Sequence, residues 1–164
     1  MIKKISRRVL REKVLQILYA FEMNGDGLKN LTEGILADLT EDTDKEFCRM
    51  LVHKILANKK QLDEFISDRI ENWEMNRIAI IDKLLLRMGI CEILYLPDIP
   101  PKVSINEIIE IAKNFSTPNS GKFLNGVLDT ILIKLRETGE LNKTGRGLMD
   151  DSLVKIPHNK SSDE

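Results

Sequence analysis

The sequence predicts an all-α fold of about seven helices. Apolar residues recur at helical spacing almost from end to end, and no stretch shows the alternating pattern of a β-strand. Glycine and proline clusters separate the apolar stretches and would end one helix before the next begins. With 164 residues, of which 42% are hydrophobic and 31% charged, the chain suits one globular domain with a real core.

Four helices are expected in the first half of the chain. The first ends at a strong breaker, Asn24-Gly25-Asp26-Gly27, and the third has Thr43 or Asp44 as its cap. The fourth is short and leads to Trp73. Their expected bounds are residues 7–23, 28–39, 44–58 and 61–71.

A long central helix is expected next, over residues 76–96, which is about 31 Å at a rise of about 1.5 Å per residue. It is apolar nearly all round, which predicts packing on several sides. The proline-rich segment 97–101 would end it. The capping-box pattern Ser104-Ile105-Asn106-Glu107 predicts the start of another helix, and Thr117-Pro118 the start of the last.

The helical periodicity fails after Thr138. The sequence therefore predicts a single helical domain over residues 1–138. Residues 139–164 combine glycine, proline and mixed charge, and are expected to form a disordered tail.

Basic charge is concentrated at the start of the chain. The whole protein has 25 basic and 26 acidic residues, yet residues 1–13 hold six basic side chains against the single acid Glu12. The six are Lys3, Lys4, Arg7, Arg8, Arg11 and Lys13. A patch of this kind can bind a polyanion while the rest of the molecule remains slightly acidic.

Placed on a helical wheel, the first helix separates an apolar stripe from a basic flank. Arg8, Arg11 and Tyr19 lie together outside the stripe. Arginines beside an aromatic ring suit single-stranded nucleic acid, with the cations on phosphates and the ring under an unstacked base. The alternative is a solvated basic face with a half-buried tyrosine, which these residues alone favour because short basic runs on helices are common.

A second candidate patch lies near the start of the last helix. Lys122, Asn125, Gly126 and Asp129 face away from its apolar stripe, with Phe123 at the margin. Gly126 costs about 1 kcal/mol relative to alanine inside a helix, so either a ligand or another helix would approach closely there. The neighbouring Ser-Gly-Lys lacks the glycine and hydroxyl positions of a phosphate-binding loop, which excludes nucleotide binding by that motif.

No enzymatic or metal site is expected. Cys48 and Cys91 stand alone in apolar helical contexts, as core thiols of a reduced, cytoplasmic protein. His53 and His158 belong to no cluster with metal-ligand spacing. The apolar stretches are too short to span a membrane, and no signal peptide is recognised. We therefore expect no catalytic residue, metal, cofactor or membrane association.

Four sequence blocks, in order, resemble the NusB family of transcription antitermination factors. The first is Arg7-Arg8-x-x-Arg11-Glu12 with Gln16-Ile17-Leu18-Tyr19. The others run from Asp82 to Ile93, from Pro101 to Lys113 and from Lys122 to Asp129. Together they cover roughly residues 6–135, and the last two are fairly specific in combination.

The resemblance implies a fold, a partner and a ligand. The fold would be two packed three-helix bundles plus one further helix. The chain would pair with the ribosomal protein NusE and bind boxA RNA, and through that complex join other Nus factors and RNA polymerase to support transcription of ribosomal RNA. The implied RNA surface comprises Lys4, Arg7, Arg8, Arg11, Tyr19, Asp82, Lys122, Phe123 and Asn125. For the NusE surface the implied residues are Arg77 and Asp82.

Two departures and two alternatives accompany the resemblance. Val9 interrupts what is a run of three arginines in some relatives, and the segment beyond Thr138 exceeds the family core. A stand-alone relative of the RNA-binding domain of rRNA methyltransferases is one alternative, although no catalytic motif is present. A helical protein-interaction module without an RNA role is the other. Whether the chain is a monomer or a homodimer stays open.

Overall fold

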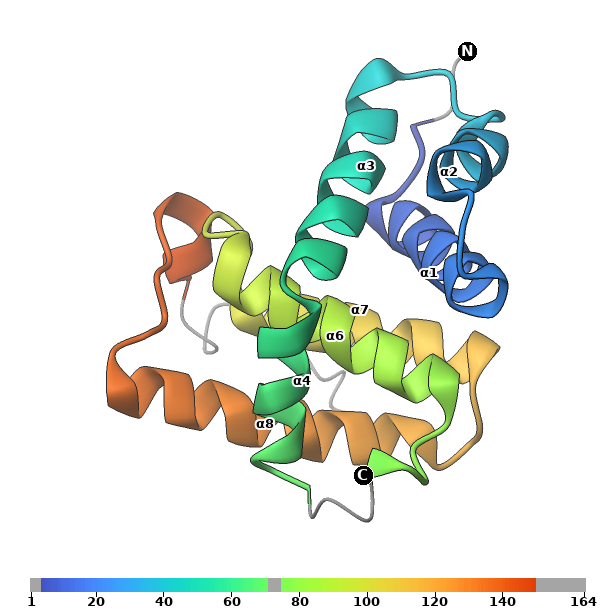
Figure 1. Cartoon of the computed structure of the whole chain (residues 1–164). Helices are drawn as coiled ribbons and strands as arrows, with labels where there is room; N and C mark the ends of the chain where they lie inside the picture. Colours follow the sequence, from blue (N-terminus) through green and yellow to red (C-terminus); the bar gives the residue numbers. More distant parts are fainter. Residues whose placement is uncertain (1–3, 71–74, 150–164) are drawn as a thin grey trace, which may run out of the picture.

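The computed structural model describes residues 4–70 and 75–149. Within these ranges the chain forms seven α-helices, one short 3₁₀ helix and no strand (Figure 1), so the predicted all-α fold class is confirmed. The elements are α1 (Arg7–Asn24), α2 (Leu28–Leu36), α3 (Asp42–Ala57), α4 (Lys59–Ser67), α6 (Ile80–Tyr95), α7 (Pro101–Phe115), α8 (Ser120–Thr138) and η1 (Gly145–Leu148).

The helices form two groups of three, as the family resemblance implies. α1 packs on α2 and α3, while α6, α7 and α8 pack on one another. α4 packs on α6, and α6 also touches α1 and α3, so this helix joins the two groups. In Figure 1, α3 rises away from the layered α6, α7 and α8, with α1 and α2 beside it.

The central helix α6 is buried on all sides. Every residue from Leu84 to Ile93 is buried, which confirms the packing predicted from its continuous apolar sequence. Gly89 lets the neighbouring helices approach closely, because a Cβ at this position would lie 3.1 Å from both δ-methyl groups of Leu128 and 3.4 Å from Cγ1 of Ile108. The core is therefore continuous from α6 into α7 and α8.

The central helix is shorter than predicted. It begins at Ile80 rather than at residue 76, because the backbone of Ala79 is not helical (φ −56°, ψ 141°). The other early helices lie near their expected positions, with α2 ending at Leu36 and α4 covering Lys59–Ser67. The expected end of the fourth helix, including Trp73, falls outside the described residues.

Both predicted caps in the second half are wrong. α7 begins at Pro101, which is well placed there because the first helical residue needs no amide donor. Ser104 and Glu107 consequently lie inside the helix, where their side chains bond to other helices instead of capping. α8 begins at Ser120, after Pro118 and Asn119 have formed a turn.

The segment after α8 differs from the expected disordered tail over residues 139–149. Gly139 ends α8 in the left-handed region (φ 74°), and the chain then returns to the C-terminal end of α6. Lys143 is buried there and donates to the carbonyls of Glu92 (3.2 Å) and Leu96 (2.8 Å). The amide of Thr144 donates to the carbonyl of Pro97 (2.9 Å). Residues 150–164 lie outside the described part of the chain.

Candidate nucleic-acid interface

The first turn of α1 sets the direction of the arginines. Ser6 caps the helix, since its hydroxyl accepts from the amide of Val9 at 3.3 Å. The apolar stripe of the helix is buried, namely Leu10, Val14, Ile17 and Leu18. The cap and the buried stripe therefore fix which residues of the first three turns can face solvent.

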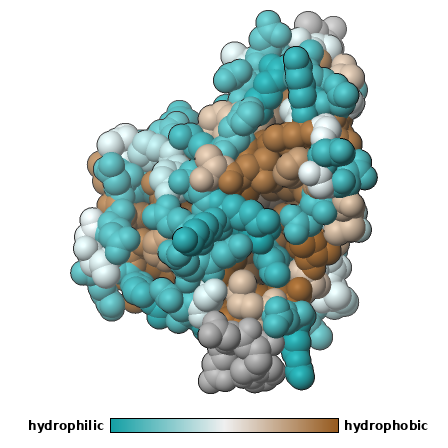
Figure 2. All heavy atoms as spheres, in the orientation of Figure 1, coloured by the Kyte–Doolittle hydropathy of each residue, from teal (hydrophilic) through white to brown (hydrophobic). Residues whose placement is uncertain are grey.

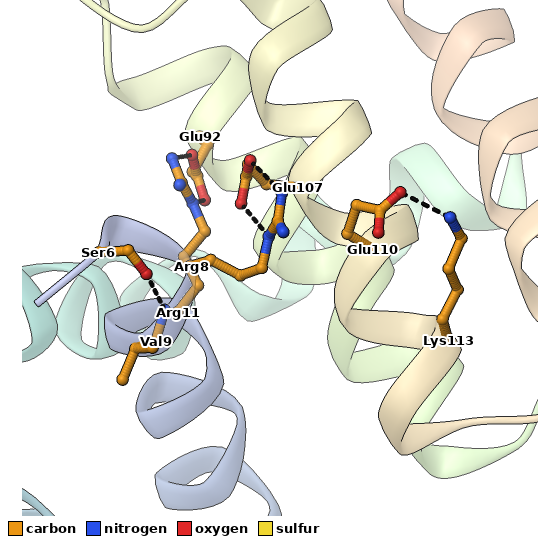
Figure 3. Close-up of polar contacts among 8 residues, drawn as sticks. All are labelled: Ser6, Arg8, Val9, Arg11, Glu92, Glu107, Glu110 and Lys113. Atoms are coloured by element: carbon orange, nitrogen blue, oxygen red, sulfur yellow. Dashed lines mark hydrogen bonds and ion pairs between the residues drawn. The ribbon is translucent and has the colours of Figure 1, made fainter.

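Arg11 does not face solvent, contrary to the helical-wheel prediction. Its guanidinium donates to both carboxylate oxygens of Glu92, at 2.8 and 2.7 Å (Figure 3). The hydroxyl of Ser104 donates to the same carboxylate at 2.9 Å. The two charged side chains are 4% and 0% exposed. Burial opposes the charge, but the bonds and charge of Glu92 outweigh it and raise the pKa of Arg11. Arg11 is thus out of reach of an RNA phosphate and joins α1 to α6.

Arg8 lies one turn earlier and remains at the surface. Its guanidinium donates to both carboxylate oxygens of Glu107 on α7, at 2.9 and 3.0 Å (Figure 3). The Arg8 side chain is 44% exposed, and hydrogen bonding to Glu107 raises its pKa. Arg8 therefore has a partner within the protein yet stays accessible to an external anion.

Arg7 and Lys4 complete the accessible basic group. Both are exposed. The guanidinium of Arg7 lies 3.9 Å from the centroid of the Phe47 ring, a cation–π contact that orients this cation without neutralising it.

These arginines line a groove of about 940 Å³ between the start of α1, α3, the start of α7 and η1. Its apolar walls include Phe47, Met50, Leu96, Ile99 and Val103. Arg146 adds a further cation from η1, and the acids are Glu46, Asp98 and Glu107. The groove is therefore lined by apolar side chains together with charges of both signs.

Tyr19 lies further along α1 and is 40% exposed. It lies eleven positions after Arg8 in the sequence, about 17 Å along a helix axis. A single-stranded RNA spans that distance in a few nucleotides, so one strand can reach both side chains.

The predicted patch on α8 is exposed. Lys122, Phe123 (37% exposed), Asn125 and Gly126 all face solvent. Nothing lies within 4 Å of a Cβ built on Gly126, so a tight helix–helix contact is not the reason for this glycine. Among the described residues, no hydrogen bond or ion pair links this patch to the arginines of α1.

Asp82 is not at the surface, although the family resemblance implies contact with RNA and with NusE. It is 8% exposed and accepts from the hydroxyls of Ser116 (2.6 Å) and Ser120 (2.9 Å), one on each oxygen. These bonds tie the start of α6 to the turn between α7 and α8. Arg77, the other residue suggested for the NusE surface, is exposed just before α6.

The sequence reasoning missed the polar residues that hold the site together. Glu92 is a charged residue between apolar neighbours in the second half of α6, and a buried charge requires a partner, so this position is a usable signal in the sequence. The sequence predicts a cap at Ser104 and a tail at Lys143, because their hydrogen-bond partners, on α6 or directly after it, are distant in the sequence.

A second hollow, of about 330 Å³, lies between α2 and α3. Figure 2 shows hydrophobic residues at the surface beside α3, with smaller hydrophobic areas elsewhere on the same face among hydrophilic residues. In the wall of the hollow, a guanidinium nitrogen of Arg49 lies 3.0 Å from a carboxylate oxygen of Glu33. His53 also lines the hollow and is exposed. This hollow contains none of the residues predicted to bind RNA.

Neither a metal-holding cluster nor a membrane-spanning helix is found in the described ranges. No group of three histidine, cysteine or acidic side chains there is placed to hold a metal ion. No helix in residues 4–70 and 75–149 combines the length and apolar character needed to cross a bilayer.

Fold and surface together define a small two-bundle helical protein with accessible arginines at the start of its first helix. Residues 8–132 match the NusB family model, and the chain belongs to the NusB family. The transcription antitermination protein NusB of Salinibacter ruber is 47% identical over 152 residues, which are 92% of this chain and 95% of that protein.

Solved structures show the same architecture. T. maritima NusB is 37% identical, with a TM-score of 0.76 over 85% of this chain and all of that one. A NusB chain solved with NusE and double-stranded RNA is 22% identical, with a TM-score of 0.71 over 78% of this chain and 96% of that chain. The second comparison supports the fold alone.

Proposed function

We propose that this chain is a transcription antitermination factor that binds boxA RNA together with NusE. The observation that carries the proposal is the exposed basic group Lys4, Arg7 and Arg8 at the start of a helix that also presents Tyr19. Membership of a family whose relatives are called transcription antitermination proteins supports it, and the fold that this chain shares is that of a NusB chain solved with NusE and RNA.

Lys4, Arg7 and Arg8 would contact phosphates, and Tyr19 would stack on a base. Lys122, Phe123 and Asn125 would extend the RNA surface along α8, where Gly126 leaves room for a nucleotide backbone. Arg11 and Asp82 take supporting roles, because their polar atoms are already bonded inside the protein. Arg77 remains our candidate for the NusE surface.

The proposed role is non-enzymatic and cytoplasmic. Other Nus factors and RNA polymerase would be reached through the complex with NusE. The match to 95% of the S. ruber relative favours an antitermination factor over a methyltransferase domain, since the region shared with that relative spans nearly its whole length. The protein-interaction module without an RNA role is separated from our proposal by experiment.

Salt dependence tests the RNA surface. Affinity for single-stranded RNA should fall as salt rises, and Arg7→Ala and Arg8→Ala should each reduce the log–log slope by about 0.7. Glu110→Gln, which leaves both arginines in place, should not reduce it. An RNA interaction whose affinity does not change with salt would contradict the proposal.

A further inference from the structure

Two arginine–glutamate pairs lie one helical turn apart where α1 meets α6 and α7. Arg11 bonds to Glu92 on α6, and Arg8 bonds to Glu107 on α7 (Figure 3). Both are two-point contacts with similar distances. They differ in exposure, since the inner side chains are 4% and 0% exposed and the outer ones 44% and 20%.

This difference in exposure decides which arginine can exchange its glutamate for another anion. Separating the inner pair would leave buried charges without partners, which is costly. An exposed pair contributes little to stability, so another anion can replace the carboxylate at small cost. A phosphate is a suitable replacement, because two of its oxygens match the guanidinium fork in the same way as a carboxylate.

We propose that Glu107 is an internal competitor for RNA at Arg8. In the free protein its carboxylate occupies the guanidinium that a phosphate would contact, so RNA must displace Glu107 to bind there. Glu107 is thus a residue that sets RNA affinity, and this inference rests on the proposed RNA-binding function.

The same helix offers a matched control. Glu110 is one turn from Glu107 and carries the same charge, but its carboxylate accepts from Lys113 at 2.6 Å. It acts on Arg8 through its charge and not through a hydrogen bond. Glu110→Gln therefore removes a nearby negative charge without releasing Arg8, whereas Glu107→Gln does both with little change in shape.

The experiment measures the affinity of labelled single-stranded boxA-like RNA for five proteins at one salt concentration. They are the wild type, Glu107→Gln, Glu110→Gln, Arg8→Ala and the double variant Arg8→Ala/Glu107→Gln. We expect Glu107→Gln to bind about two- to fivefold more tightly than Glu110→Gln, the range expected for removing an exposed ion pair. In the Arg8→Ala background, Glu107→Gln should increase RNA affinity by no more than the removal of one nearby negative charge does, which Glu110→Gln measures.

Each outcome separates this inference from the proposed function. If the wild type binds and Arg8→Ala weakens binding, equal affinities of Glu107→Gln and Glu110→Gln would overturn the competitor role alone. The competitor role would also be overturned if Glu107→Gln increased RNA affinity as much in the Arg8→Ala background as in the wild-type background. If no protein binds the RNA, with or without NusE, the proposed function itself fails. Thermal melting verifies that all five proteins are folded.

Discussion

Arg11 and Glu92 form a buried two-point ion pair that joins α1 to α6. Ser104 on α7 joins this ion pair, because its hydroxyl donates to the same carboxylate. Three helices from both bundles therefore meet at one group of charges. An arginine that the sequence suggested for RNA thus stabilises the scaffold that displays the others.

Arg11→Ala should destabilise the fold strongly. Removing one member of a buried pair leaves the Glu92 charge without its main partner, at a cost of about 3–5 kcal/mol in the free energy of unfolding. Arg8→Ala, at the exposed pair, should cost at most about 1 kcal/mol. Urea denaturation of the two variants compares these costs directly, and equal stabilities would contradict the structural role of Arg11.

Gly147→Ala should release the segment after α8. A Cβ at this position would lie 1.9 Å from the carbonyl oxygen of Pro97, so the contact with the end of α6 cannot persist. Hydrogen exchange of the Thr144 amide, which donates to that carbonyl, should become faster. Gly34→Ala is the control, because no atom lies within 4 Å of its Cβ position. An unchanged hydrogen-exchange rate of the Thr144 amide in Gly147→Ala would refute the docking of this segment.

The docking of Lys143 should strengthen at alkaline pH. Burial lowers the pKa of this side chain from 10.5 to about 8, against the opposing charges of Glu92 and Asp98. Between pH 8 and 10.5 the undocked or unfolded chain therefore binds more protons at this position than the folded one, so the contribution of Lys143 to stability rises with pH there. Below about pH 8 its contribution is constant, because the amine is protonated in both states.

The measurement is the unfolding free energy of the wild type minus that of Lys143→Met, as a function of pH. This difference should increase through the alkaline window, since all other titrating groups are shared by the two proteins. A flat difference would show that Lys143 does not titrate in this way.

Gly126→Ala should separate folding from binding. It should stabilise α8 by about 0.5–1 kcal/mol, because glycine is costly inside a helix and the added methyl group meets nothing. If RNA approaches this face closely, the same methyl group should weaken RNA binding. A variant that is more stable and binds RNA equally well would remove Gly126 from the proposed RNA surface.

Cys48 and Cys91 should be unreactive in the folded protein. Burial raises the pKa of Cys48 to about 11 and that of Cys91 to about 12, so few thiolates exist at neutral pH. Maleimide labelling should be slow in buffer and complete at both thiols in denaturant. Rapid labelling of the native protein would contradict their burial.

Local patterns in the sequence predicted the helices well and their polar partners poorly. The bounds of α1 follow from an apolar stripe and a Gly-containing breaker, which act within a few residues of one another. The sequence predicts a cap at Ser104 because the neighbouring residues fit one, whereas the partner of Ser104 is Glu92 on another helix.

Arg8 and Arg11 show the same limit of prediction from local sequence patterns. A helical wheel separates apolar from polar positions, but it does not reveal which charged residue meets an opposite charge on another helix. Arg8 and Arg11 therefore look equivalent in the sequence, and only tertiary packing makes one exposed and the other buried.

The most direct test is a titration of labelled boxA-like RNA and a scrambled control with this protein, with and without NusE. The account predicts tighter binding to the boxA-like RNA, strengthened by NusE and weakened by Arg8→Ala and Tyr19→Ala in folded protein. Equal or absent binding to both RNAs under all these conditions would contradict it.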